Sequence, residues 1–169
     1  MSRVSKHIKT MKEYSEEELK YKAEVYCSAA ERCPSEVEKK LNQWGASADI
    51  TESIMLHLFK ERYLDTTRYC CAFVRDKYRF NQWGRMKISQ ALRMKQLPSG
   101  DIEIGLDEIN DEEYHTILAA LLKQKAKSTK ATTTYERNTK LIRFATGRGF
   151  LMDEILRHIK QVDQDEYME

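Results

Sequence analysis

Glycine and proline are scarce in this chain of 169 residues, which has six glycines and two prolines. A β-sandwich or barrel needs many tight turns, and a dinucleotide-binding fold needs glycine-rich loops, so both are disfavoured. Charged residues make up 33% of the sequence and the mean hydropathy is −0.70, which leaves little apolar material for a core. Nine tyrosines, seven methionines and a net charge of only +2 argue against disorder. The composition therefore predicts a folded, helical protein with a thin core.

Long apolar runs are also absent, since the longest, from Ile117 to Leu122, is far too short to cross a bilayer. The basic start of the chain is followed by no apolar stretch, so no secretory signal is visible. The four cysteines form no C-x-x-C pair and the four histidines lack a ligand spacing, which suits neither a zinc site nor a disulfide framework. We expect a cytoplasmic protein with reduced thiols, no metal, no cofactor and no membrane contact.

Catalytic motifs are missing as well: the sequence has no P-loop, no H-E-x-x-H and no nucleophile elbow. The acidic residues of 107–113 fall at a helix end and the next helix start, where solvated acids favour the helix dipole. Trp44 and Trp83 could stack nucleic-acid bases, but each precedes a glycine at a helix boundary, which favours a packing role. We therefore expect a protein that is not an enzyme.

The near-neutral total charge hides blocks of one sign. Residues 13–61 have a net charge of −5, whereas residues 66–97 carry eight bases against one acid, a net of +7. Residues 98–113 carry seven acids and no base, and residues 123–148 carry eight bases against one acid. A solvated helical surface normally mixes the two signs, so the basic blocks suggest an anionic or acidic partner.

Helix start and stop signals recur along the whole chain. They predict helices over residues 15–32, 34–44, 47–63, 66–80, 85–97, from 101 onward, 111–127, 135–148 and 151–162. Pro34 suits a first helical position, Gly45 a left-handed helix end, and Asp65 a helix N-cap. The polar residues 127–134 are predicted to form a mobile linker.

The predicted helices repeat in threes. An apolar anchor in the second helix of each trio, at Leu41, Leu92 and Ala145, recurs at intervals of 51 and 53 residues. The fold class predicted is all-α, with three tandem, helix-turn-helix-like three-helix repeats stacked into an elongated, curved arc. The boundaries are a flexible basic tail at 1–14, repeats at 15–63, 64–110 and 111–163, and an acidic tail at 164–169. Chance agreement of helical periods is the alternative.

One helix face in the +7 block is a candidate contact surface. At 100° per residue, Arg68, Arg75 and Arg79 fall on one side of the helix over 66–80. Tyr69, Phe73 and Phe80 fall on the opposite side and are expected to form its buried face, so the three guanidinium groups should point to solvent. Some cations should pair with acids of the neighbouring repeat, with Arg75 the exception.

Two groups of residues resemble a known family signature. The segments are Tyr63 to Tyr69, Phe73 to Lys77, Trp83 to Ile88 with Leu92, and later Arg143-Phe144, Arg148 to Phe150 and Ile155. They are similar to the RecX family, and the resemblance covers about residues 20–162. Two departures concern local geometry: Cys33 stands where the family usually has a serine, and Gln96-Leu97 replaces the glycine-containing helix end of the first and third repeats of this chain.

The resemblance implies a bacterial cytosolic regulator that binds the RecA recombinase filament on DNA and restrains its ATPase, strand-exchange and repressor-cleavage activities. The expected partners are this filament and, weakly and without sequence selectivity, single- and double-stranded DNA, with the chain acting as a monomer. The expected contact residues are the cations of the two basic blocks: Arg68, Arg75, Arg79, Arg85, Lys87, Arg93, Lys95, Lys125, Lys127, Arg143 and Arg148. A stand-alone DNA-binding protein and a helical scaffold without a nucleic-acid role remain the alternatives.

Overall fold

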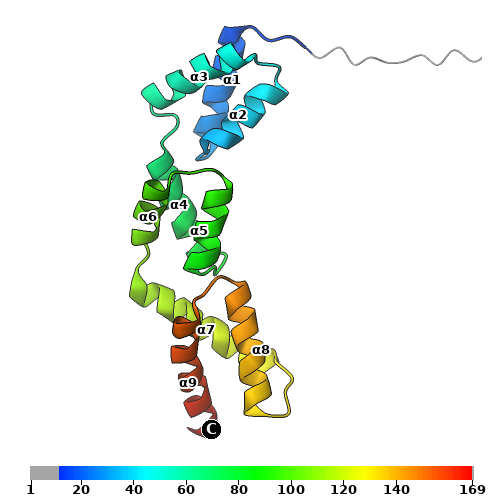
Figure 1. Ribbon diagram of the computed structural model, residues 1–169, viewed down its shortest axis with the longest axis vertical. Coiled ribbons are helices and arrows are strands. Elements are labelled where there is room, and N and C mark those ends of the chain that lie inside the picture. Colours follow the sequence, from blue (N-terminus) through cyan, green and yellow to red (C-terminus); the bar gives the residue numbers. More distant parts are fainter. Residues whose placement is uncertain (1–11, 169) are drawn as a thin grey trace, which may run out of the picture. The chain divides into compact units, whose positions relative to one another are not determined.

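Residues 12–168 are described by a computed structural model, and throughout that range the regular structure is helical (Figure 1). The helices are α1 (Glu16–Ala29), α2 (Pro34–Gln43), α3 (Ala48–Lys60), α4 (Thr66–Arg79), α5 (Arg85–Met94), α6 (Ser99–Asp107), α7 (Asp111–Ser128), α8 (Thr134–Gly147) and α9 (Met152–Met168). The all-α class predicted from the sequence is confirmed. Most of the predicted basic tail, residues 1–11, lies outside the described residues.

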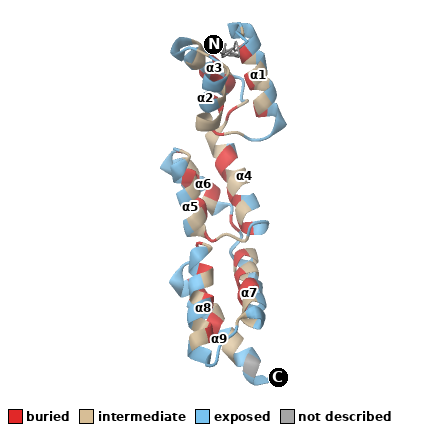
Figure 2. Cartoon of the chain, turned by 90° about the vertical axis from the view of Figure 1, so that its right-hand side faces the viewer, coloured by how far each residue is buried: buried red, intermediate tan, exposed pale blue. Residues whose placement is uncertain are grey.

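The chain divides into two compact units, unit 1 from Met1 to Leu64 and unit 2 from Asp65 to Glu169. In unit 1, helices α1 to α3 pack around a core that includes Leu19, Leu41 and Leu58. Unit 2 holds two trios, α4 to α6 and α7 to α9, and its buried residues, red in Figure 2, lie along the helices where they pack together. The division into three separate repeats stays a prediction.

Helix ends follow local capping chemistry. Asp65 accepts a hydrogen bond from the N–H of Arg68 at 2.9 Å, and Gly45 ends α2 with φ of +88°, as predicted. The helix expected from residue 101 begins earlier, at Ser99, because Pro98 can precede a first turn without needing its missing N–H. Residues 127–128 of the predicted linker belong to α7, whose polar side chains continue its last turn.

The three anchors close the same turn in each trio, which supports the repeat register. Each anchor carbonyl accepts the N–H of the fifth residue after it: Ala46 to Leu41 at 3.0 Å, Leu97 to Leu92 at 3.4 Å, and Phe150 to Ala145 at 3.2 Å. The residue before each donor has a positive φ: +88° at Gly45, +62° at Gln96 and +95° at Gly149. The departure noted at Gln96 therefore leaves the backbone geometry of the turn unchanged.

Replacing Gln96 with glycine should stabilise the protein. A side chain in the left-handed region costs about 1–2 kcal/mol, of which the greater freedom of unfolded glycine offsets about 0.5–1 kcal/mol. We expect Gln96→Gly to raise the melting temperature by a few degrees, measured by circular dichroism. Gly45→Ala is the opposite test, because a Cβ at Gly45 meets no atom within 4 Å and only the φ of +88° opposes it. A lower melting temperature for Gln96→Gly would contradict this account.

The two trios of unit 2 meet backbone to backbone. The N–H of Gly84 donates to the carbonyl of Arg148 at 2.8 Å, and the N–H of Met86 donates to that of Gly149 at 3.0 Å. A Cβ on Gly84 would lie 2.3 Å from backbone atoms of Gly149 and Phe150. Glycine is therefore required at position 84 by close approach, and this contact holds the start of α5 against the end of α8.

Helices α7 and α9 are joined by a pair of histidines. The Nδ1 atom of His115 lies 3.0 Å from Nε2 of His158. Burial, and then the charges of His115 and Arg157, lower the pKa of His158 below its usual value near 6.5. Since the unfolded chain then binds the proton more tightly, stability should fall as pH drops below about 6.5. We expect the urea midpoint to decrease between pH 7 and pH 5, and His158→Gln to reduce that decrease; an unchanged pH profile would contradict it.

Candidate partner and nucleic-acid interface

The buried side of α4 differs from the prediction. Phe80 is 80% exposed and Phe73 only half-buried, whereas Val74 and Tyr78 are fully buried together with Tyr69. Phe80 follows the last turn of α4 as its C-cap, so its side chain leaves the helix face. The expected arrangement of Phe73 and Phe80 in a core was therefore wrong.

Two of the three arginines expected to point freely to solvent are in ion pairs. Arg79 donates to Glu113 from Nε at 2.9 Å and from Nη2 at 3.2 Å. Arg75 Nη1 lies 3.5 Å from an Oε atom of Glu108, which falls in the same predicted repeat, so this pair does not join Arg75 to an acid of the neighbouring repeat. Arg68 is exposed but has interactions of its own. Part of the acidic segment 107–113, expected to be solvated surface, therefore serves as an internal counterpart of the basic block.

Arg85 connects three helices of unit 2. Its guanidinium pairs with Asp111 and, at 3.1 Å, with Glu154, while its backbone N–H donates to the Tyr114 hydroxyl at 3.1 Å. The Tyr114 hydroxyl donates in turn to Glu154 at 3.2 Å, and burial raises the pKa of Tyr114 above its usual value. Arg85 therefore has a structural role between α5, α7 and α9.

These pairs change what charge reversal of the arginine face would do. A glutamate at position 75 or 79 would stand beside Glu108 or Glu113, so like charges would replace attractive ones. Reversal of Arg68, Arg75 and Arg79 together would therefore also weaken the contacts of α4 with Glu108 and Glu113. It cannot serve as a clean test of partner binding.

Lysines of the +7 block lie over aromatic rings instead. The Nζ of Lys77 is 5.2 Å from the centre of the Phe73 ring and 4.8 Å from that of Trp83. Lys87 Nζ lies 4.4 Å from the centre of Trp83, and Lys95 Nζ lies 6.0 Å from that of Phe73. A ring attracts a cation without neutralising it, so Lys77 and Lys87 keep their full charge for an anionic partner.

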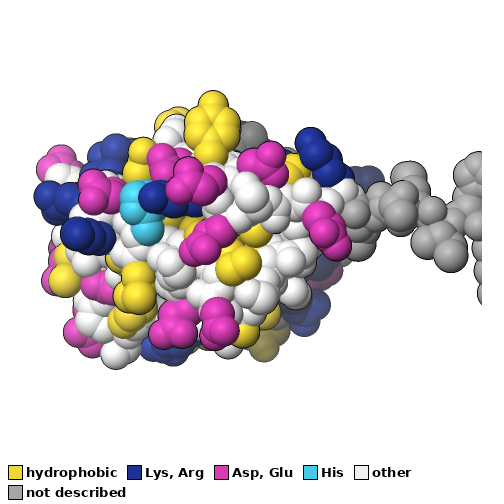
Figure 3. Space-filling view, turned by 90° about the horizontal axis from the view of Figure 1, so that it is seen from above, with side chains coloured by type: hydrophobic (Ala, Val, Ile, Leu, Met, Phe, Trp, Pro, Cys, Tyr) yellow, Lys and Arg dark blue, Asp and Glu magenta, His cyan; other side chains and the backbone are white. Residues whose placement is uncertain are grey.

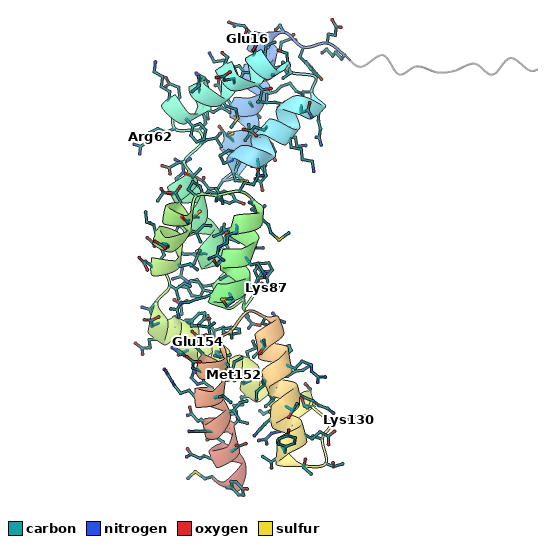
Figure 4. All side chains as sticks on the ribbon, viewed as in Figure 1. Glu16, Arg62, Lys87, Lys130, Met152 and Glu154 are labelled. Carbon is teal, nitrogen blue, oxygen red and sulfur yellow. The ribbon has the colours of Figure 1, made fainter. Side chains whose placement is uncertain are left out.

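The second basic block continues this pattern. Lys125 Nζ and Arg148 Cζ lie 4.8 Å and 5.3 Å from the centre of the Phe144 ring. Arg148 also donates to the carbonyl of Asn81 at 2.8 Å, which places Phe144 and its cations next to the Trp83 group. We call this set the cation–aromatic strip: Phe73, Lys77, Trp83, Lys87, Lys125, Phe144 and Arg148. In Figure 4, Lys87 lies at the end of α5 that meets α8.

The remaining predicted contact residues lie outside the strip. Arg93, Lys127 and Arg143 are exposed. The strip has a sequence signal that the charge count missed, since each of three rings is followed four residues later by a cation: Phe73 by Lys77, Trp83 by Lys87, and Phe144 by Arg148. On a helix or across a helix end, that spacing brings the two side chains together.

Other kinds of site receive no support in residues 12–168. No group of three or more His, Cys, Asp or Glu side chains in that range could hold a metal ion. None of the helices there is both long and apolar enough to cross a membrane. On the face drawn in Figure 3, carboxylates are scattered among polar and hydrophobic side chains. The four cysteines, all within these residues, form no disulfide, and burial raises the pKa of the Cys27 thiol to about 11.

Comparison with known proteins points to a single family. Residues 66–106 match the family model described as RecX, second three-helix domain. The chain is 24% identical over 118 residues to a protein named Regulatory protein RecX from Leuconostoc mesenteroides, covering 70% of this chain and 44% of that protein. It is 30% identical over 89 residues to a protein of the same name from Lactobacillus johnsonii, covering 53% and 33%. The chain thus spans less than half the length of these curated relatives.

Solved structures show the same fold. The crystal structure of RecX from Lactobacillus salivarius superposes with a TM-score of 0.80 at 21% identity, covering 88% of this chain and 97% of that one. A crystal structure of a regulatory protein RecX superposes with a TM-score of 0.75 at 23% identity, covering 86% and 73%. At these identities the likeness establishes the fold alone.

Proposed function

The chain belongs to the RecX family, and from that membership we propose that it is a non-enzymatic, cytoplasmic regulator of the RecA recombinase. It binds the RecA filament on DNA and inhibits the filament's ATPase, strand-exchange and repressor-cleavage activities. Recombination and the SOS response are thereby restrained.

The cation–aromatic strip is the observation that supports this function best. It presents Lys77, Lys87 and Lys125 over rings rather than in ion pairs, and so offers positive charge to an anionic filament. The strip has residues in both trios of unit 2. Its first four residues, Phe73 to Lys87, lie within the range 66–106 that the family model matches. A filament is itself extended, and a row of separated cations suits it better than a single pocket.

Binding to DNA by itself is expected to be weak and independent of sequence. Cations over aromatic rings are typical of surfaces that follow a nucleic-acid backbone, and few Asn or Gln side chains accompany these cations to read bases. If about six phosphates are contacted, the logarithm of affinity should fall with the logarithm of salt at a slope near −4 for single strands. A footprint that is selective for sequence and insensitive to salt would favour a stand-alone DNA reader.

Titration of recombinase ATPase on single-stranded DNA tests the proposal. The chain is added at concentrations below those that coat the same DNA without recombinase, which are measured separately by filter binding. We expect inhibition in this range. Inhibition only after the naked DNA is saturated would show that the chain acts by masking DNA, and no inhibition would contradict the proposal outright.

A further inference from the structure

Unit 1 carries a second group of cations held over rings, in a region where acids predominate. Lys22 Nζ lies 4.7 Å from the centre of the Trp44 ring, Arg32 Cζ 3.9 Å from that of Tyr26, and Lys40 Nζ 5.6 Å from that of Tyr26. The two rings contact each other edge to face at 6.3 Å. Three cations from α1, α2 and the connection between them therefore surround one pair of rings.

The acids that could neutralise the two lysines are occupied elsewhere. Glu18 and Glu36 precede Lys22 and Lys40 by four residues, the spacing of a favourable helix ion pair. Each carboxylate instead accepts a backbone N–H at its own helix start, from Ser15 at 2.9 Å and from Cys33 at 3.2 Å. Within the described part of unit 1, neither lysine forms an ion pair. The N-terminal caps thus leave both ammonium charges unneutralised.

We infer that this cluster, Lys22, Arg32 and Lys40 around Tyr26 and Trp44, is a binding site for the backbone of single-stranded nucleic acid. Its cations lie on α1, on the connection after it and on α2. Cations separated in this way can contact several phosphates, whereas a single carboxylate would contact only one of them. The half-buried rings hold the cations at the surface, and a row of cations that follows the backbone beside aromatic side chains is typical of single-strand binding. Residues 13–61 have a net charge of −5, so unit 1 as a whole does not attract anions. Binding of nucleic acid to unit 1 would therefore depend on this cluster.

The site is separate from the cation–aromatic strip, which lies wholly in unit 2. Its binding does not depend on recombinase, so it can be tested without that partner. A failure here would leave the ATPase test of the proposed function standing, and a failure of that test would leave this site untouched.

The test compares two charge-matched variants of the full chain. Lys22→Gln with Lys40→Gln removes the two unneutralised lysines, and Lys39→Gln with Lys60→Gln removes two exposed lysines elsewhere in unit 1. Binding to fluorescein-labelled oligo(dT) is measured by anisotropy over a range of salt concentrations, after circular dichroism has shown equal helicity. Arg32 is left in place because its Nε donates to the Tyr26 carbonyl at 3.1 Å.

We expect the first variant to bind about fivefold more weakly, with a salt slope shallower by about 1.4, the value for two lost phosphate contacts. The oligo(dT) affinity of the control variant should change less than about twofold, because Lys39 and Lys60 lie outside the proposed site. Equal losses in both variants, or no loss in either, would overturn the inference. Binding to polyglutamate is measured in parallel. If Lys22→Gln with Lys40→Gln leaves oligo(dT) binding unchanged but removes polyglutamate binding, the inference is overturned in favour of an acidic protein partner.

A fluorescence measurement keeps the test local. The sequence has two tryptophans, so Trp83→Phe leaves Trp44 as the single indole reporter. Oligo(dT) should quench Trp44, and adding Lys22→Gln with Lys40→Gln should raise the oligonucleotide concentration for half-maximal quenching about fivefold. Unaltered Trp44 emission at saturating oligonucleotide would contradict binding at this cluster.

Discussion

The combined variant Lys77→Gln, Lys87→Gln and Lys125→Gln should need at least tenfold more protein than the unaltered chain for half-maximal inhibition of recombinase ATPase. Each ammonium lies over an aromatic ring and is available to an anionic surface. Exposed charge pairs contribute about 0.5–1 kcal/mol each, and about 1.4 kcal/mol corresponds to tenfold in binding, so three lost pairs give this effect.

A charge-matched control separates the strip from net charge. Lys123, Lys130 and Lys160 are exposed on α7, the connection after it, and α9, and their replacement by glutamine removes the same three charges. The control should inhibit within about threefold of the unaltered chain, since screened charges away from an interface contribute little. If the two variants lost inhibition equally, attraction by overall charge would replace the strip as the explanation.

Gly84→Ala should destabilise unit 2 strongly. The new Cβ would meet Gly149 and Phe150 backbone atoms at 2.3 Å, and backbone cannot move aside as a flexible side chain can. Overpacking of this kind costs about 1–3 kcal/mol. Separation of α5 from α8 would also move Phe144 and Arg148 away from Trp83, so inhibition should weaken while helicity is kept.

Gly147→Ala is the matched control for this change. Gly147 lies two residues before Gly149 at the end of α8, and a Cβ there meets nothing within 4 Å. Alanine in a helix is favoured over glycine by about 1 kcal/mol, so the control should be unchanged or slightly stabilised. Thermal unfolding monitored by circular dichroism measures both variants, and equal melting temperatures would mean that the trios do not meet as described.

Local signals explain why so much of the helical structure could be predicted from the sequence. Asp65, Gly45 and Pro34 act on their own neighbours, and the cap, the turn and the first helical position they predict are all observed. The ends of some helices differ from the prediction. Helix α6 begins at Ser99 rather than at residue 101, and α9 continues to Met168 rather than ending at residue 162. Such ends depend on whether a terminal turn gains packing, which helical periodicity does not show.

The candidate site could be predicted only in part, because charge counts ignore distant partners. Arg75 and Arg79 pair with acids 33 and 34 residues further along, and no spacing rule connects such positions. The exposure of Phe80 depends on where α4 ends, which helical periodicity does not show either. By contrast, the three rings that are each followed by a cation four residues later can be read from the sequence. That spacing alone identifies six of the seven strip residues, and only Lys125 requires the structure.

Co-sedimentation tests the central claim most directly, that the target is the recombinase filament on DNA. The chain is mixed with filaments on single-stranded DNA, with the same DNA alone, and with recombinase alone, at equal component concentrations and physiological salt. The account predicts that the chain sediments with the filament at concentrations at which it leaves naked DNA and free recombinase unbound. Equal sedimentation with naked DNA and with the filament would contradict it.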